Sequence, residues 1–161
     1  MPFLTAQFVG GKGLASLAIE LKGAGPYSHV DMVCDDGRLL GARSDECGGQ
    51  PPGVRIRPQG YEEWNAIAQI SIPCTDAQHD AAWAFWMAQI GKAYDKTAIL
   101  AFVFGRDWEN PEDWFCSELR AAGLKAAKVF PFDLITPANK VDPDMEFAIE
   151  STHGIVRLIK K

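Results

Sequence analysis

Strand-like segments dominate the first half of this 161-residue chain, and helical segments dominate the second half. Short runs with alternating or β-branched residues lie at 3–9, 28–34, 38–42, 54–57 and 64–72, and a last edge strand is expected at 154–159. Apolar residues recur at helical spacing in 14–22, 76–90, 96–104 and 117–128. Because strand–helix–strand alternation is rare, the order predicts an α+β fold, with an antiparallel sheet packed against helices in a single domain over residues 1–161.

Residues 28–42 form the clearest hairpin of the sequence. Asp36-Gly37 between two strand-like runs is a favoured two-residue turn. With a loop of those two residues, Asp35 faces Arg38 and His29 lies opposite Ser44. This register makes Ser44 a candidate partner of the His29 side chain.

Composition and charge narrow the classes of function. The formal net charge is −5, so a surface that tracks phosphates, and with it a nucleic-acid partner, is not expected. No apolar run reaches the roughly 18 residues that span a bilayer. The N-terminal residues show no basic and apolar signal sequence, so a cytoplasmic location is expected.

The four cysteines are not arranged for metal binding. None forms a CxxC pair and none stands near a histidine at zinc-ligand spacing. We therefore expect reduced thiols, no metal and no cofactor.

Cys116 stands where the aromatic pair Trp114-Phe115 ends and the helical run that begins at Ser117 starts. The first-turn N–H groups of a helix have no partner within it, and the helix dipole places partial positive charge there. A thiolate at this position is therefore stabilised as a nucleophile. The most promising base is His29, in the strand-like run Tyr27-Ser28-His29-Val30. The alternative is that Cys116 is a small buried apolar residue.

These residues resemble a known family. The blocks Tyr27-Ser28-His29-Val30, Gly91-Lys92-Ala93-Tyr94-Asp95 and Trp114-Phe115-Cys116-Ser117-Glu118-Leu119 are similar to those of the circularly permuted branch of the NlpC/P60 superfamily. This papain-like group includes YiiX-type proteins and lecithin:retinol acyltransferase. The order of the blocks, with the histidine strand first and the cysteine helix last, is the order of the permuted branch.

The resemblance implies a role for each matching residue. Cys116 would be the nucleophile, and His29 would accept its proton and later protonate the leaving group. Tyr94 and Asp95 would shape the site or orient its residues, although a plain turn explains them nearly as well. Tyr27 belongs to the histidine block and is a further candidate.

One position departs from the family pattern. The family places a polar residue that orients the imidazole on the strand after the histidine strand, and this sequence has Gly41 there. Our register argument offers Ser44 instead. The third residue is thus missing, shifted or supplied from elsewhere.

Three functions remain open at this point. The favoured one is a thiol hydrolase that cleaves an amide bond, with a cell-wall peptide as the substrate class that the resemblance suggests and with a bacterial or phage origin. The second is a thioester-forming acyltransferase or lipid hydrolase acting on a lipid-like substrate. The third is a binding module of the same fold that has lost catalysis, which the glycine at position 41 would permit.

Overall fold

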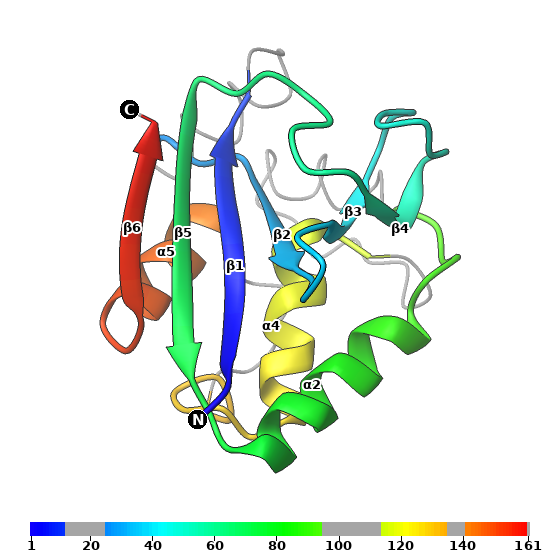
Figure 1. Cartoon of the computed structure of the whole chain (residues 1–161). Coiled ribbons are helices and arrows are strands. Elements are labelled where there is room, and N and C mark those ends of the chain that lie inside the picture. The colour runs from blue at the N-terminus through cyan, green and yellow to red at the C-terminus, as the bar shows by residue number, and fades with distance from the viewer. Residues whose placement is uncertain (12–24, 95–113, 135–140, 161) are drawn as a thin grey trace.

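The structure is a computed structural model that describes residues 1–11, 25–94, 114–134 and 141–160 (Figure 1). The helices expected at 14–22 and 96–104 lie outside these residues. Within them, six strands form one antiparallel sheet with the order β4-β3-β2-β1-β5-β6. The strands are β1 (Phe3–Gly10), β2 (His29–Val33), β3 (Leu39–Arg43), β4 (Gly53–Arg57), β5 (Ala66–Pro73) and β6 (Ile155–Lys160).

The predicted α+β class is confirmed, and the central strand is the first one. Ala6 of β1 pairs with Met32 of β2 on one side and with Ile70 of β5 on the other. β6 pairs only with β5 among the described strands, so the expected edge strand at the end of the chain is also confirmed.

The register predicted for the hairpin is wrong by one residue. Met32 pairs with Leu40 and Val33 with Leu39, and the Cys34 amide donates to the Arg38 carbonyl at 2.8 Å. The loop therefore has three residues, and its last one, Gly37, adopts a φ of 82° that suits glycine. Because a shift of one residue moves a side chain to the other face of a sheet, Ser44 does not lie opposite His29.

Three helices accompany the sheet in the described part of the chain: α2 (Asp76–Ala88), α4 (Cys116–Ala126) and α5 (Pro143–Ser151). α4 and α5 lie behind the sheet in the view of Figure 1. Thr75 caps α2, and its side chain accepts the Gln78 amide. α5 was not predicted. None of the described helices has an apolar stretch long enough to cross a membrane.

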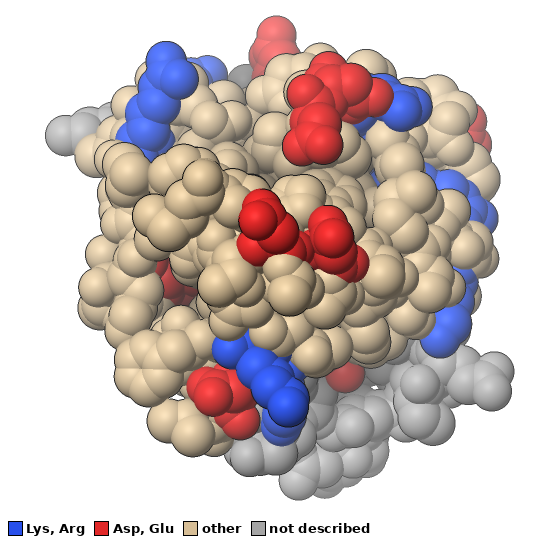
Figure 2. Space-filling model, turned by 60° about the horizontal axis from the view of Figure 1, so that its bottom comes forward, with Lys and Arg blue, Asp and Glu red and all other residues tan. Residues whose placement is uncertain are grey.

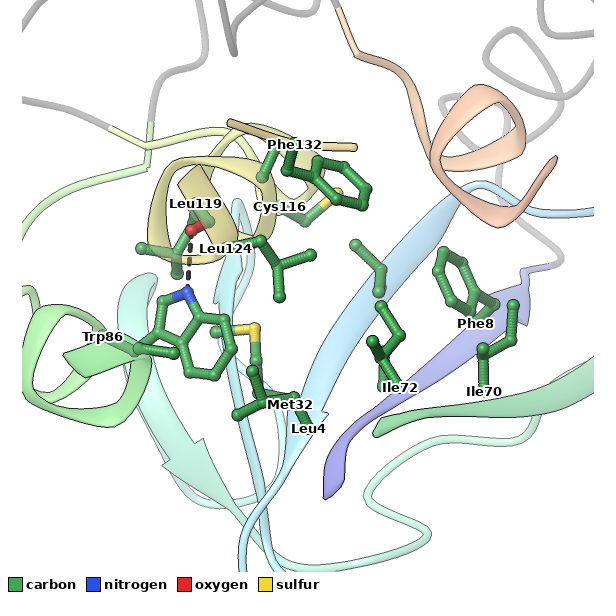
Figure 3. Packing of buried hydrophobic residues seen from close by; sticks show 14 of the residues in the cluster. Leu4, Phe8, Met32, Ile70, Ile72, Trp86, Cys116, Leu119, Leu124 and Phe132 are labelled. Carbon is green, nitrogen blue, oxygen red and sulfur yellow. Dashed lines mark hydrogen bonds between the residues drawn. The ribbon is translucent and has the colours of Figure 1, made fainter. Parts of the chain in front are cut away.

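Trp86 joins α2 to α4 inside the core (Figure 3). Its indole N–H donates to the Leu119 carbonyl at 3.0 Å, and the residue is 0% exposed. A Cβ on Gly123 would lie 1.9 Å from the indole nitrogen, so α4 has a glycine where the ring approaches its backbone. The same apolar cluster contains Leu4, Met32 and Cys116, so one core joins the sheet to the helix that carries the candidate nucleophile.

Candidate active site

Cys116 is the first residue of α4, as the sequence predicted. Phe115 is its N-cap in an extended conformation and offers no side-chain acceptor to the first-turn amides. Trp114 forms an isolated parallel bridge with Tyr94, which fixes the chain just before the helix. Glu118 accepts the Phe115 N–H at 3.5 Å. The partial positive charge at the start of α4 can therefore stabilise negative charge that forms on Cys116.

His29 is the first residue of β2 and lies beside Cys116. It pairs with Val9 of β1, and its ring stacks on the Trp64 indole with the centroids 6.1 Å apart and the planes at 16°. The Cys116 thiol is close enough to the ring for its charge to raise the His29 pKa. Both residues are buried, at 6% and 1% exposed. The structure thus brings together the two side chains that the sequence selected, each at the first position of its element.

Asp31 provides the second contact of the imidazole. Its Oδ1 lies 2.9 Å from Nε2 of His29, and its Oδ2 accepts the Tyr61 hydroxyl at 2.8 Å. Since Nε2 is occupied by Asp31, Nδ1 is the nitrogen left for the Cys116 thiol. The thiol, imidazole and carboxylate therefore form a connected series, in the order that nucleophilic catalysis requires.

The loop between β4 and β5 covers this series with Tyr61 and Trp64. Arg43, at the end of β3, lies over both rings, with Cζ 5.6 Å from the Tyr61 centroid and 5.3 Å from the Trp64 centroid. It also donates to Glu62 at 2.6 Å. These contacts hold the two aromatic residues against His29 and Asp31, where they limit the access of water.

Charge and burial act in opposite directions on His29. Burial lowers the His29 pKa. The interactions with Asp31 and Cys116 raise it by more than burial lowers it, so the pKa is raised to about 9. For Asp31, burial raises the pKa, but the interactions with His29, the hydrogen bond from Tyr61 and the charge of Arg43 outweigh it, so the pKa is lowered. At neutral pH the site therefore holds an imidazolium beside a carboxylate.

Two other candidate residues lie close to this series but do not join it. Tyr94 packs its ring against Phe115, with the centroids 6.0 Å apart, next to the start of α4. Tyr27 is buried in the core, with its ring 4.5 Å from that of Phe147. Its amide donates to Oδ1 of Asp144 at 3.0 Å, which joins the start of β2 to α5. Both positions fit a supporting role.

The remaining two candidates do not contribute to the described site. Ser44 follows the end of β3, and the one-residue register shift takes it away from the position opposite His29. Asp95 lies outside the described residues.

Asp31 is the site residue that the sequence analysis missed. The signal was present, because residues two apart in a strand share a face, and Asp31 follows His29 by two within β2. The family pattern and the predicted register both point to the neighbouring strand, so neither indicates the acid on the histidine strand itself. Tyr61 belongs to a loop, where no periodicity could indicate its contact with Asp31.

The described residues offer no metal-binding cluster of three or more His, Cys, Asp or Glu side chains. All four cysteines are free thiols. A groove of about 370 Å³ lies elsewhere, between the β2–β3 turn and α2, and its lining includes Arg38, His79 and Trp83 but none of the predicted site residues. On the face that Figure 2 shows, acidic and basic side chains are interspersed among uncharged ones. The predicted absence of a nucleic-acid partner stays a prediction.

Comparison with known proteins gives a likeness of fold. Neither protein-family models nor curated protein sequences match this chain. A crystal structure described as the metalloprotein YiiX from Escherichia coli O157:H7 is similar, with a TM-score of 0.62 and 17% sequence identity over 99% of this chain and 97% of that chain. At this identity the likeness concerns the fold alone, and the chain has a YiiX-like fold.

Proposed function

We propose that this protein is a thiol hydrolase that cleaves an amide bond through Cys116 and His29. The observation that carries the proposal is the closeness of a cysteine at a helix start to a buried histidine whose Nε2 contacts a carboxylate. A buried cysteine that served only packing would need neither partner. The order of thiol, imidazole and carboxylate supports nucleophilic catalysis.

In the first half of the reaction the Cys116 sulfur attacks the substrate carbonyl carbon and forms a C–S bond. The carbonyl electrons move to oxygen, and the backbone N–H of Cys116, at the positive end of α4, stabilises that oxyanion. When the intermediate collapses, the C–N bond breaks, and the His29 imidazolium gives its proton to the leaving nitrogen. The products are a thioester on Cys116 and a free amine.

In the second half water hydrolyses the thioester. The now neutral His29 takes a proton from water as the water oxygen bonds to the acyl carbon. The C–S bond then breaks, the carboxylic acid leaves, and sulfur departs as thiolate beside the re-formed imidazolium. This frees Cys116 and His29 for the next substrate.

The papain-like, permuted NlpC/P60 assignment is part of this proposal. It is supported by the three matching sequence blocks, by the contact between the histidine and cysteine blocks, and by the YiiX-like fold. The substrate class that goes with it is a short peptide amide of the bacterial cell wall.

Alkylation by iodoacetamide tests the reacting pair without any assumption about substrate. We expect Cys116 to react at neutral pH with a rate that changes as His29 titrates near about pH 9. Cys34 and Cys47 serve as internal references, since burial raises the pKa of both thiols. The shape of the pH profile is the readout, because the burial of Cys116 reduces its rate at every pH alike. A Cys116 profile that matches the two references and does not change in His29→Ala would contradict the proposal.

Turnover tests then separate the reaction classes. Peptidoglycan-derived peptides, a phospholipid and a fatty-acyl ester are each incubated with the wild type, Cys116→Ala and His29→Ala. Release of a new amine from the peptides, lost in both variants, supports the amidase. Acyl transfer from the lipid, lost in the same variants, would replace it with an acyltransferase. No covalent chemistry with any probe, together with an ordinary Cys116 profile, would indicate a binding module.

A further inference from the structure

A glycine on β3 lies where the side chain of Asp31 needs room. Continuing the register of β2 and β3 places Gly41 across from Asp31. An ideal Cβ at position 41 would lie 1.8 Å from Oδ1 of Asp31, the oxygen that contacts His29. Gly41 has no positive φ, so its backbone does not require glycine, and the reason is the space that the carboxylate occupies.

Asp31 leans toward this space and away from its other neighbour. On the opposite side, β1 places Gln7 across from Asp31, and the Gln7 side chain is engaged by Gln59 at 2.8 Å and by Gln69 at 3.2 Å. The Gly41 carbonyl accepts a hydrogen bond from Nη1 of Arg57 at 3.2 Å. The room at position 41 is therefore a fixed feature of the sheet.

We propose that Asp31 is the residue that positions the His29 imidazole, and that its carboxylate occupies, from β2, the space that a side chain on β3 would otherwise fill at position 41. This inference rests on the proposed function, since a positioned imidazole has a role only if His29 acts on Cys116. It assigns the missing third residue to the histidine strand and explains the glycine. The positioning of His29 thus depends on both strands, because Gly41 on β3 leaves the room that the Asp31 carboxylate on β2 occupies.

The second oxygen of Asp31 supports this assignment. Tyr61 donates to Oδ2, so the carboxylate is held at both ends, by Tyr61 and by His29. A carboxylate fixed in this way selects the His29 tautomer with hydrogen on Nε2 and directs Nδ1 to the thiol. Asp31 is 1% exposed, so solvent does not compete for these contacts.

The experiment moves the carboxylate from one strand to the other. The proteins compared are the wild type, Asp31→Asn, Asp31→Gly, Gly41→Asp and the double variant Asp31→Gly with Gly41→Asp. The matched control is Asp36→Asn, which breaks an exposed Asp–Arg contact of 2.7 Å in the same hairpin. The readouts are the pH profile of Cys116 alkylation, the NMR titration and tautomer of His29, and turnover of a cell-wall peptide.

We expect Asp31→Asn to lower the His29 pKa, to change its tautomer population and to reduce turnover by about 10²-fold or more. Gly41→Asp alone is expected to perturb the site, because its side chain meets Asp31. The double variant should recover part of the His29 titration and of turnover relative to Asp31→Gly. Recovery of this kind distinguishes positioning from a purely structural role.

Two different failures are distinguishable. If Cys116 shows an ordinary alkylation profile in the wild type, the proposed function is wrong, while the NMR titration still reports on Asp31 and His29. If Cys116 and His29 behave as a pair but Asp31→Asn leaves the titration and alkylation profile of the wild type, the positioning role is overturned. Tyr61→Phe, which removes only the Oδ2 contact, should give a smaller change of the same sign and provides the test if Asp31→Asn does not fold.

Discussion

Asp31 and Glu146 are two buried carboxyl groups near Cys116 with opposite surroundings. Asp31 is 1% exposed and has His29 and Tyr61 as partners. Glu146 is 0% exposed, and neither of its oxygens has a hydrogen-bond partner among the residues that the structure describes. The pKa of Asp31 is lowered. The pKa of Glu146 is raised well above its ordinary value, first by burial and then by the charge of Glu150. The partners of a buried acid therefore decide whether it carries charge.

Glu150 shows what a partner changes at nearly the same place. It lies one turn after Glu146 on α5. Its carboxylate accepts hydrogen bonds from Nε and Nη2 of Arg120 on α4, at 2.9 and 3.2 Å. Both members of this pair are fully buried. Within the described part of the chain Glu146 has no such contact, so burial favours its neutral form, whereas the partners of Asp31 favour its ionised form.

The largest expected effect comes from turning Glu150 into a second unpartnered acid. Arg120→Met removes the partner and leaves two buried carboxyls one turn apart. We expect a loss of about 3–5 kcal/mol in the free energy of unfolding, measured by urea titration. Arg120→Met with Glu150→Leu is the control, and it should recover most of the loss. A loss below about 1 kcal/mol would show that Arg120 and Glu150 are not coupled as their geometry indicates.

A smaller loss is expected when Asp31 loses its charge. Asp31→Asn should destabilise the fold by roughly 2–3 kcal/mol, because the contact with His29 weakens and the Tyr61 hydroxyl keeps only a neutral acceptor. The loss is limited because His29 can give up its proton. Thermal and urea unfolding measure it, with Asp36→Asn as the exposed reference. Equal stabilities of the two variants would contradict the contrast drawn between paired and unpaired acids.

The opposite sign is expected for Glu146. Glu146→Met replaces two unpartnered oxygens with an apolar side chain of similar length, and we expect a gain of about 1–2 kcal/mol. Glu146→Gln keeps polar atoms in the same place and should give little or no gain. If Glu146→Met destabilises the protein as much as Asp31→Asn, Glu146 has a partner that its surroundings do not reveal.

The smallest signal is the pH dependence of these differences, on the order of 1 kcal/mol. The raised His29 pKa contributes stability below its unfolded value of 6.5 that is lost as pH rises through about 9. The lowered Asp31 pKa contributes stability above its unfolded value of 3.8 that is lost as pH falls through the folded pKa. The deficit of Asp31→Asn should therefore be largest between these unfolded values and shrink toward pH 9.

Glu146 should show the reverse trend. Its raised pKa makes the folded state prefer the protonated acid, so the wild type loses stability as pH rises above the unfolded value of 4.5. The advantage of Glu146→Met should grow over that range in urea titrations at several pH values. An advantage that stays constant with pH would mean that Glu146 keeps the same charge in the folded and unfolded states.

Much of the fold and half of the site followed from local patterns. Alternation indicated the strands, and the helical run that begins at Asp76 and the helix start at Cys116 were found at the expected positions. α5 was missed, although Asp142 as a cap with Pro143 at the first position is a helix-start signal. The placement of Ser44 opposite His29 was wrong, because it relied on a register set by the loop that contains Gly37.

The sequence by itself determined which segments are strands or helices, and it placed a cysteine at a helix start and a histidine on a strand. These properties depend on residues two to four positions apart, so they can be read from spacing. Only the tertiary structure decided that Asp31 contacts His29 beside Gly41, that Tyr61 donates to the same carboxylate, and that Glu146 is buried with no hydrogen-bond partner in the described segments. The physical reason is that these contacts depend on strand register and on the packing of distant segments, which local spacing does not specify.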